Sequence, residues 1–227
     1  MSGKNLEGKP GTKAELKLSN KPPARIKICG LSRPCDIDYV NEAKPDFAGF
    51  VINYPKSRRS VTPKQAAALR KRLRAEIVSV GVFVNEEIDA VAGLLNDGII
   101  EIAQLHGQED EAYIAKLRAL TDKKIIQAFT VSSKEDVKRA LKSSADYILL
   151  DNGRGTGAAF DWRLVKEIKR PWFLAGGLTP ENIGAAFEKL HPWAADLSSG
   201  VETDGYKDRE KILAVCKAMR RSERQRY

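Results

Sequence analysis

Short β-rich runs alternate with longer segments of helical spacing along most of this chain, and this alternation constrains the fold more than any other feature. From Arg25 onward there are eight runs rich in Val, Ile, Leu and Phe, several almost continuously apolar, as in strands covered on both faces. The predicted strands span residues 25–29, 46–52, 77–84, 100–106, 124–130, 145–151, 171–177 and 194–200. Such alternation is typical of repeated βα units and a parallel sheet.

Eight amphipathic segments are expected beside these strands. Ala66, Leu69 and Leu73 share one face of the segment 63–75, and the segment 86–97 shows the same apolar spacing. Ser or Thr followed by Pro or by acidic residues favours a helix start, because these residues suit the unpaired N–H groups of the first turn. Such starts are predicted at Thr62-Pro63, Ser132-Ser133 and Thr179-Pro180.

The number of units favours a single closed (β/α)8 TIM barrel of the α/β class over an open doubly wound sheet. Residues 25–219 provide about 24 residues per unit, which is short but sufficient for such a barrel. A dinucleotide-binding sheet needs GxGxxG after its first strand, whereas this chain reads KICGLSRP there. The glycines of GRGTGAAF at 153–160 follow the sixth strand and indicate a loop.

Composition excludes several classes of protein. With 42% hydrophobic and 30% charged residues in 227, the chain is neither collagen-like nor of low complexity. It has no uncharged apolar stretch of about 18–20 residues and no apolar core of a secretory signal, so we expect a cytoplasmic protein without membrane contact. Three cysteines and two histidines are too few for a disulfide framework or a zinc pattern, so no metal is expected.

The formal net charge of +9 is concentrated at the two ends of the chain. Residues 1–24 hold five Lys and two Glu, and residues 220–227 hold four Arg and one Glu, which gives +3 for each end. We therefore predict a basic, disordered N-terminal extension at 1–24, a catalytic domain at 25–219 and a basic tail at 220–227. The domain has no cluster of Lys and Arg interleaved with aromatic residues, so no nucleic-acid partner is predicted.

Candidate functional residues follow nearly every predicted strand. In a barrel the active site is built at the carboxyl ends of the strands, so these residues are expected to converge. They are Cys29-Gly30, the loop from Asn53 to Arg59, Asn85, Gln104, His106-Gly107, the loop from Asp151 to Gly157, Gly176-Gly177 and Ser198 to Gly200.

Seven segments of the chain resemble, in order, the phosphoribosylanthranilate isomerases, which are (β/α)8 enzymes of tryptophan biosynthesis. The segments are KICGLSRP at 27–34, FAGFV with PKSRRSVTP at 55–63, VGVFVN at 80–85, QLHG at 104–107, ILLDN with GTGAAFDW at 155–162, LAGGLTPENI at 174–183 and DLSSGVET at 196–203. The resemblance implies a cofactor-free Amadori rearrangement of an aminoaldose that carries a phosphate and an anthranilate carboxylate. An acid opens the ribose ring, and a base removes the proton from carbon 2.

The resemblance assigns the general base to Cys29 and the general acid to Asp151. Both roles require a shift in protonation, since reference pKa values of about 8.5 for a thiol and about 3.9 for a carboxyl favour the wrong form at neutral pH. Lys27 lies two residues before Cys29 on the same strand face and is a possible partner of the thiolate.

Substrate binding is assigned in the same way. Arg59 matches the arginine that holds the anthranilate carboxylate, by its spacing to Pro55, and Arg58 is then a surface charge. His106 either lines the site near the anthranilate ring or is bonded locally, and Asp196 either orients a substrate hydroxyl or lies inside the barrel. The phosphate is expected on backbone amides and hydroxyls of Gly155, Gly157, Gly176, Gly177, Ser198, Ser199 and Gly200.

Two other functions stay open from the sequence. Indole-3-glycerol phosphate synthase, a related phosphosugar barrel, would need a catalytic lysine and glutamate in place of Cys29 and Asp151. A non-catalytic barrel could bind RNA through its basic ends. The sequence also leaves open whether the protein is a monomer or a homodimer, and whether an aminoaldose of the histidine pathway is a second substrate.

Overall fold

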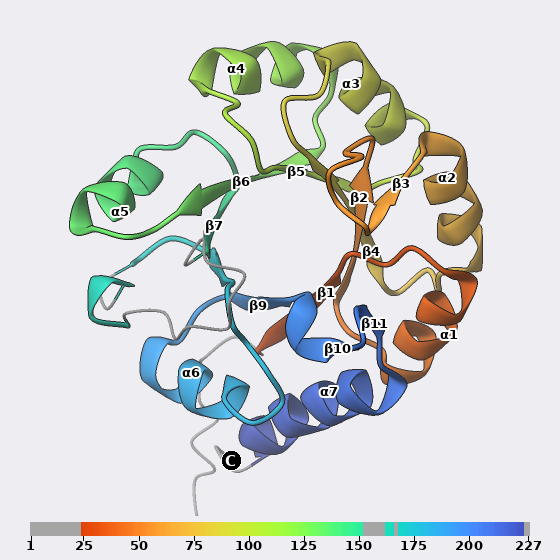
Figure 1. Cartoon of the computed structure of the whole chain (residues 1–227). Helices are drawn as coiled ribbons and strands as arrows, with labels where there is room; N and C mark the ends of the chain where they lie inside the picture. Colours follow the sequence, from red (N-terminus) through yellow and green to blue (C-terminus); the bar gives the residue numbers. More distant parts are fainter. Residues whose placement is uncertain (1–23, 152–161, 166–167, 225–227) are drawn as a thin grey trace, which may run out of the picture.

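Eight parallel strands close into a barrel with helices around it, as the sequence predicts (Figure 1). The structure is a computed structural model and describes residues 24–151, 162–165 and 168–224. The barrel strands are β1 (Arg25–Cys29), β2 (Phe47–Ile52), β4 (Val78–Phe83), β5 (Ile102–Leu105), β6 (Lys124–Thr130), β7 (Tyr147–Asp151), β8 (Trp172–Leu174) and β9 (Ala194–Leu197). The ring closes because β1 pairs in parallel with both β2 and β9.

The outer layer contains seven α-helices within the described residues. They are α1 (Pro34–Ala43), α2 (Pro63–Arg72), α3 (Ile88–Asn96), α4 (Glu111–Leu120), α5 (Lys134–Leu141), α6 (Ile183–Leu190) and α7 (Arg209–Arg224). The described part of the β7–β8 connection holds a 3-10 turn, η1 (Trp162–Val165), where an eighth helical segment is predicted. A second 3-10 turn, η2 (Ser199–Val201), follows β9.

Two of the three predicted helix starts are confirmed. Thr62 and Ser133 cap α2 and α5, and in each case the third helical residue bonds back to the cap. The start predicted at Thr179-Pro180 is wrong, because α6 begins only at Ile183. The side chain of Asn182 explains the delay, since it accepts a hydrogen bond from the Thr179 amide and donates one to the Gly177 carbonyl, which stabilises a turn.

Most predicted strands are one or a few residues too long, and β8 differs most. It ends at Leu174, whereas the apolar run predicts a strand through Gly177. Gly176 and Gly177 have φ angles of 90° and 66°, a left-handed conformation that extended strand pairing does not allow. The glycine pair therefore forms a loop at the mouth of the barrel.

The sequence also missed three two-residue strands near the mouth. β3 (Ser60–Val61) pairs in parallel with the end of β2 and so fixes the loop that carries Arg58 and Arg59. β10 (Glu202–Thr203) and β11 (Tyr206–Lys207) form a small antiparallel hairpin between η2 and α7. Strands this short have no periodicity that a sequence pattern could reveal.

The last helix continues beyond the predicted end of the domain at 219, through Arg224. Arg220 donates hydrogen bonds to the carbonyls of Ala43 and Lys44 at the end of α1, where cations interact favourably with unpaired carbonyls. Residues 1–23 and 225–227 of the two predicted basic ends lie outside the described residues. Within the described ranges, every helix is too short or too polar to cross a membrane.

Candidate active site

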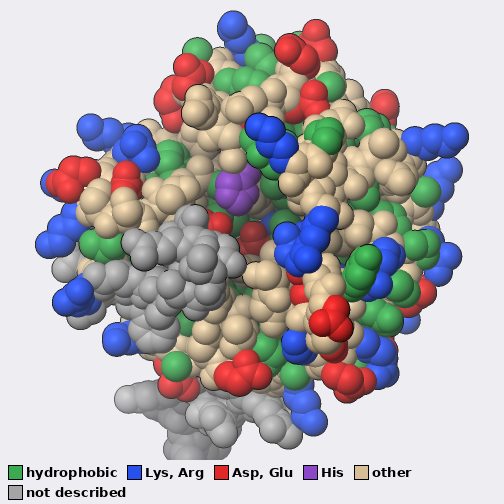
Figure 2. Space-filling model, viewed as in Figure 1, with side chains coloured by type: hydrophobic (Ala, Val, Ile, Leu, Met, Phe, Trp, Pro, Cys, Tyr) green, Lys and Arg blue, Asp and Glu red, His purple; other side chains and the backbone are tan. Residues whose placement is uncertain are grey.

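A cavity of about 300 Å³ opens at the carboxyl ends of the barrel strands. Figure 2 shows the hollow near the middle of this face, with acidic side chains in its depth and cationic side chains along one rim. The lining includes every described residue to which the resemblance gives a catalytic or substrate-binding role, namely Cys29, Arg59, His106, Asp151, Gly176, Gly177, Asp196, Ser198, Ser199 and Gly200. Of the other candidates that follow strands, Gly30, Asn85 and Gly107 do not line the cavity. Gly155 and Gly157 lie outside the described residues.

Cys29 lies at the end of β1 with only 7% of its surface exposed, above a buried ion pair. Lys27 is fully buried, and its Nζ donates hydrogen bonds to both Asp196 oxygens at 3.0 and 2.9 Å. Gly49 on β2 leaves room for this group, since a Cβ there would stand 2.9 Å from the Cys29 Sγ. The predicted proximity of Lys27 to Cys29 is confirmed, and Asp196 lies inside the barrel as their neighbour.

Opposing effects set the protonation of the thiol. Burial raises the pKa of Cys29, the nearby Lys27 ammonium lowers this pKa, and Asp196 raises it again. The net pKa is raised, because desolvation of a thiolate costs more than one neighbouring cation returns. In the free protein Cys29 is therefore a thiol at neutral pH.

Asp151 ends β7, and His106 follows β5 across the cavity. The cavity walls desolvate the imidazolium and lower the pKa of His106, although Asp151 and Asp196 oppose this shift. The Nε2 of Gln104 lies 3.1 Å from the His106 Nδ1, so the ring is held by a residue two positions earlier in the chain, on β5. The Gln104 Oε1 is buried and has no partner in the described part of the structure.

Glycines and serines form the wall between the two proposed proton-transfer groups. Gly176 and Gly177 follow β8, and Ser198 to Gly200 follow β9, so both loops face the cavity. A Cβ at Gly200 would stand 1.8 Å from the Leu178 carbonyl oxygen, so only glycine allows the two loops to pack together. The Ser198 hydroxyl donates to the Cys29 carbonyl at 3.1 Å, which connects the loop after β9 to the end of β1.

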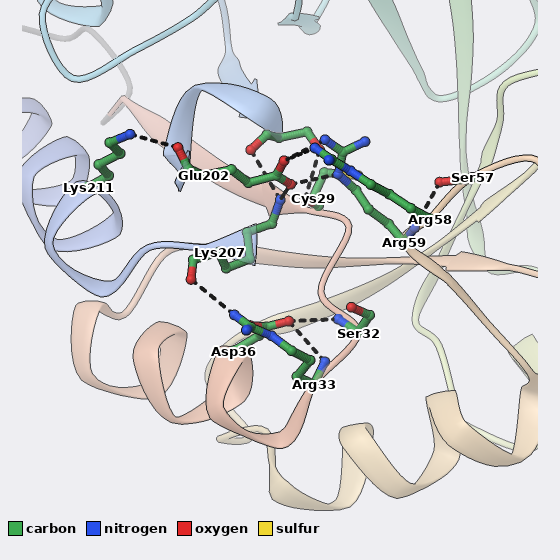
Figure 3. Close-up of polar contacts among 11 residues, drawn as sticks. Cys29, Ser32, Arg33, Asp36, Ser57, Arg58, Arg59, Glu202, Lys207 and Lys211 are labelled. Atoms are coloured by element: carbon green, nitrogen blue, oxygen red, sulfur yellow. Dashed lines mark hydrogen bonds and ion pairs between the residues drawn. The ribbon is translucent and has the colours of Figure 1, made fainter. Parts of the chain in front are cut away.

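Arg59 reaches the cavity from the loop between β2 and β3, whereas Arg58 does not line it. The Arg59 Nε and Nη2 donate to the two Glu202 oxygens, each at 2.6 Å, and Arg58 and Lys207 bind the same carboxylate (Figure 3). Burial alone would raise the pKa of Glu202, but the hydrogen bonds from Arg59 and Lys207 outweigh it and lower this pKa to about 2.

Glu202 and Lys207 are the two charged residues near the site that the sequence reasoning missed. Both are buried, with 8% and 5% of their surface exposed. Glu202 directly follows the segment SSGV, so its place in the motif DLSSGVET was the available signal. Lys207 gave no signal of its own, because an isolated lysine before a helix is usually a surface residue.

Other features of the described residues do not compete with this site. A groove of about 740 Å³ between α1 and α7 is larger, but it brings together none of the predicted site residues. Within the part of the chain that the structure describes, no group of three or more His, Cys, Asp or Glu could hold a metal ion.

Comparison with known proteins gives a consistent result over the barrel. The family model for N-(5'-phosphoribosyl)anthranilate (PRA) isomerase matches residues 26–218. The N-(5'-phosphoribosyl)anthranilate isomerase of Endomicrobium trichonymphae is 44% identical over 201 residues, covering 86% of this chain and 98% of the relative. The enzyme of Acetivibrio thermocellus is also 44% identical, covering 82% of this chain and 91% of its own length.

Solved structures agree with the sequence relatives. Phosphoribosyl anthranilate isomerase from Thermotoga maritima superposes with a TM-score of 0.79 at 34% identity, covering 87% of this chain and 98% of that one. A structure of the isomerase in complex with reduced 1-(o-carboxyphenylamino)-1-deoxyribulose 5-phosphate superposes with a TM-score of 0.77 at 34% identity. A 3-hexulose-6-phosphate synthase, at 12% identity and a TM-score of 0.64, shares the fold alone.

Proposed function

The chain belongs to the N-(5'-phosphoribosyl)anthranilate isomerase family, and from this premise we propose how its own residues carry out the reaction. The protein is an isomerase of tryptophan biosynthesis that converts the aminoaldose N-(5'-phosphoribosyl)anthranilate into 1-(2-carboxyphenylamino)-1-deoxyribulose 5-phosphate. This activity takes the place of the two other functions that the sequence left open, a synthase of indole-3-glycerol phosphate and a non-catalytic RNA-binding barrel.

One observation carries the assignment of roles: a single cavity holds Cys29 and Asp151 with the two glycine-containing loops between them. In the barrel, β9 and β8 lie between β1 and β7. A substrate whose phosphate lies on the amides after β8 and β9 would have its ribose between the two side chains. Its anthranilate group would then point toward Arg59, which follows β2 on the other side of β1.

The proton transfers follow from this placement. Asp151, in its protonated form, gives a proton to the ring oxygen, and the bond from carbon 1 to that oxygen breaks to leave an iminium ion. Cys29, as thiolate, takes the proton from carbon 2, and the electron pair of that C–H bond neutralises the iminium to give an enolamine. Tautomerisation of the enolamine gives the ketone.

Two neighbours assist these steps. Lys27 stabilises the thiolate form of Cys29, because its charge lies in a buried site where water screens little. The unpartnered Gln104 Oε1 accepts a hydrogen bond from a substrate hydroxyl, which would satisfy a buried carbonyl that has no partner in the described structure.

The experiment is turnover of the fluorescent substrate without added metal or nucleotide. Cys29→Ala and Asp151→Ala should each lower kcat by at least about 100-fold, the usual effect of removing a general acid or base. Matched controls are Cys35→Ala, a cysteine on α1, and Asp122→Ala, an exposed carboxylate, which should both keep kcat within about twofold. Near-normal kcat in a folded Cys29→Ala or Asp151→Ala variant would mean that the role belongs to another residue.

Three further statements stay proposals. The Thermotoga maritima relative is described as dimeric, with monomers generated from it, and we expect this chain to be a homodimer or a monomer. A cytoplasmic location and the absence of a nucleic-acid partner also remain expectations from the sequence.

A further inference from the structure

One buried carboxylate, that of Glu202, is bound by three cationic side chains at the rim of the cavity (Figure 3). Lys207 lies beneath it, with 1% of its side chain exposed, and also donates to the Ser198 carbonyl at 3.1 Å. Arg58 approaches from outside, with 60% of its side chain exposed. Arg59 is the one member of the three that lines the cavity.

The hydrogen bonds of Arg59 divide its guanidinium into two edges. The Nε and Nη2 edge faces Glu202 in a bidentate pair, with both distances at 2.6 Å. A guanidinium has five N–H donors, so Nη1 and the second Nη2 hydrogen form another edge with the same fork geometry. In the described part of the structure no hydrogen bond uses this outer edge, and it is suited to a second carboxylate.

The surroundings of Arg59 hold the side chain in this one orientation. The Cβ that Gly30 lacks would stand 2.4 Å from the Arg59 Cδ, so the β1–α1 loop packs directly against the aliphatic part of the side chain. Gly30 has a φ of 80°, which favours glycine for a second reason. The backbone of Arg59 is held as well, because its N–H donates to the Ser57 hydroxyl.

The charge of the cluster favours another anion. Three cations surround one ionised carboxylate, so the group keeps an excess of positive charge at the cavity rim. The loop after β9, Ser198 to Gly200, is connected to the same cluster because Lys207 donates a hydrogen bond to the Ser198 carbonyl. The orientation of Arg59 is therefore linked to the position of the loop that would hold the other end of the substrate.

We propose that Glu202 is a positioning residue that holds one edge of Arg59, so that the opposite edge receives the benzoate carboxylate of the substrate and selects for it. This inference rests on the proposed role of Arg59 as the ligand of that carboxylate. Glu202 itself does not touch the substrate. Its contribution is selectivity for a carboxylated over a non-carboxylated aniline group.

The test compares two ligands that differ only in that carboxylate. Competitive inhibition constants are measured for reduced 1-(o-carboxyphenylamino)-1-deoxyribulose 5-phosphate and for the phenylamino compound without the carboxylate. The unmodified protein should prefer the carboxylated ligand by about 100-fold, as expected for a site with a dedicated bidentate donor. Arg59→Ala should remove this preference, and Glu202→Gln should lower it by about tenfold.

The double variant Arg59→Ala/Glu202→Gln should be no less selective than Arg59→Ala, because Glu202 acts through Arg59. Arg58→Ala is the matched control, since Arg58 binds the same carboxylate but lies outside the cavity, and it should keep the full preference. If Glu202→Gln leaves Lys207 too poorly paired for the protein to fold, Glu202→Gln/Lys207→Met replaces it, with the same loss of preference expected.

The outcomes separate the inference from the function on which it rests. An unchanged or increased preference in Glu202→Gln, while Arg59→Ala removes the preference, overturns the positioning role and leaves Arg59 in place. Equal loss of affinity for both ligands in Glu202→Gln also overturns it, because that pattern indicates a structural role only. A full preference that survives Arg59→Ala means instead that the proposed role of Arg59 is wrong.

Discussion

The base and the mouth of the barrel are filled by side chains from the same strands, yet the two layers differ in chemistry. At the base, the rings of Phe47, Tyr147, Phe173 and Trp193 pack with centroids 4.7 to 5.9 Å apart. The Arg25 guanidinium lies 4.4 Å above the Trp193 ring. This end is filled by aromatic packing and a cation–π contact, so its side chains contribute to stability.

The mouth contains ionisable groups where the base contains rings. Cys29, Asp151 and Asp196 line the cavity, and Asp196 also forms a buried ion pair with Lys27. Successive inward-facing residues on a strand lie two positions apart, so β1 presents Arg25, Lys27 and Cys29 in turn. Each strand can therefore supply one packing residue and one functional residue, and changes in one layer should leave the role of the other intact.

The largest effect on stability is expected at the base. Phe173 is fully buried and contacts three other rings, so Phe173→Ala should lower the free energy of unfolding by about 3–5 kcal/mol. At a temperature where the variant is folded, kcat should stay within about twofold, because no residue of the cavity is removed. Urea unfolding and turnover measure the two quantities on the same sample.

The control is Leu120→Ala, an apolar residue with 45% of its surface exposed, which should change stability by less than about 0.5 kcal/mol. A large loss of kcat in folded Phe173→Ala would show that the two layers are not independent, because packing at the base would then position the groups at the mouth.

The second prediction concerns the pH dependence of the mouth. The active form of Cys29 is the thiolate and its pKa is raised, so kcat/KM should increase with pH until the pH passes that pKa. Lys27 lowers this pKa and Asp196 raises it. Lys27→Met should therefore shift the increase of kcat/KM to higher pH, and lower kcat/KM at pH 7 by roughly tenfold. Asp196→Asn should shift this increase to lower pH.

The opposite directions make the result specific. The charged groups that act on Cys29 come from several elements, namely Lys27 on β1, Asp196 on β9, Lys207 on β11 and Arg59 before β3. Loss of stability alone would change both variants in the same way. If the pH profiles of kcat/KM of the two variants shift in the same direction, or do not shift, Cys29 is not the group whose titration limits kcat/KM.

The smallest effect is expected outside the barrel, in the helix layer. Ser133 caps α5, and its hydroxyl and the Ser132 amide hold the pKa of Asp136 at about 2. Ser133→Ala should lower the free energy of unfolding by about 1 kcal/mol and leave kcat/KM unchanged. Thermal unfolding and turnover check this, and Lys134→Ala on the same helix should be neutral in both. A change in kcat/KM in Ser133→Ala would show that α5, outside the barrel, also affects catalysis.

Local patterns predicted most of the elements because their causes are local. Strands β1 and β6 have the predicted bounds, and the caps at Thr62 and Ser133 form as expected, since a cap involves residues three positions apart. The start of α6 was predicted too early, because Asn182 forms a competing turn with Thr179 and Gly177. The cavity lining likewise falls entirely within the seven motifs, although no role was predicted for the apolar lining residues Val51, Val82, Ala175, Leu178 and Leu197.

By itself, the sequence determined the eight barrel strands, their order along the chain and the residues at their carboxyl ends, because apolar periodicity and end residues are properties of neighbouring positions. Only the tertiary structure decided which charges meet. Lys27 pairs with Asp196, 169 residues away, because barrel closure places β1 beside β9, and Arg59 meets Glu202 over 143 residues at the same closure. Buried charges need a partner in space, and no periodicity along the chain specifies which distant residue provides it.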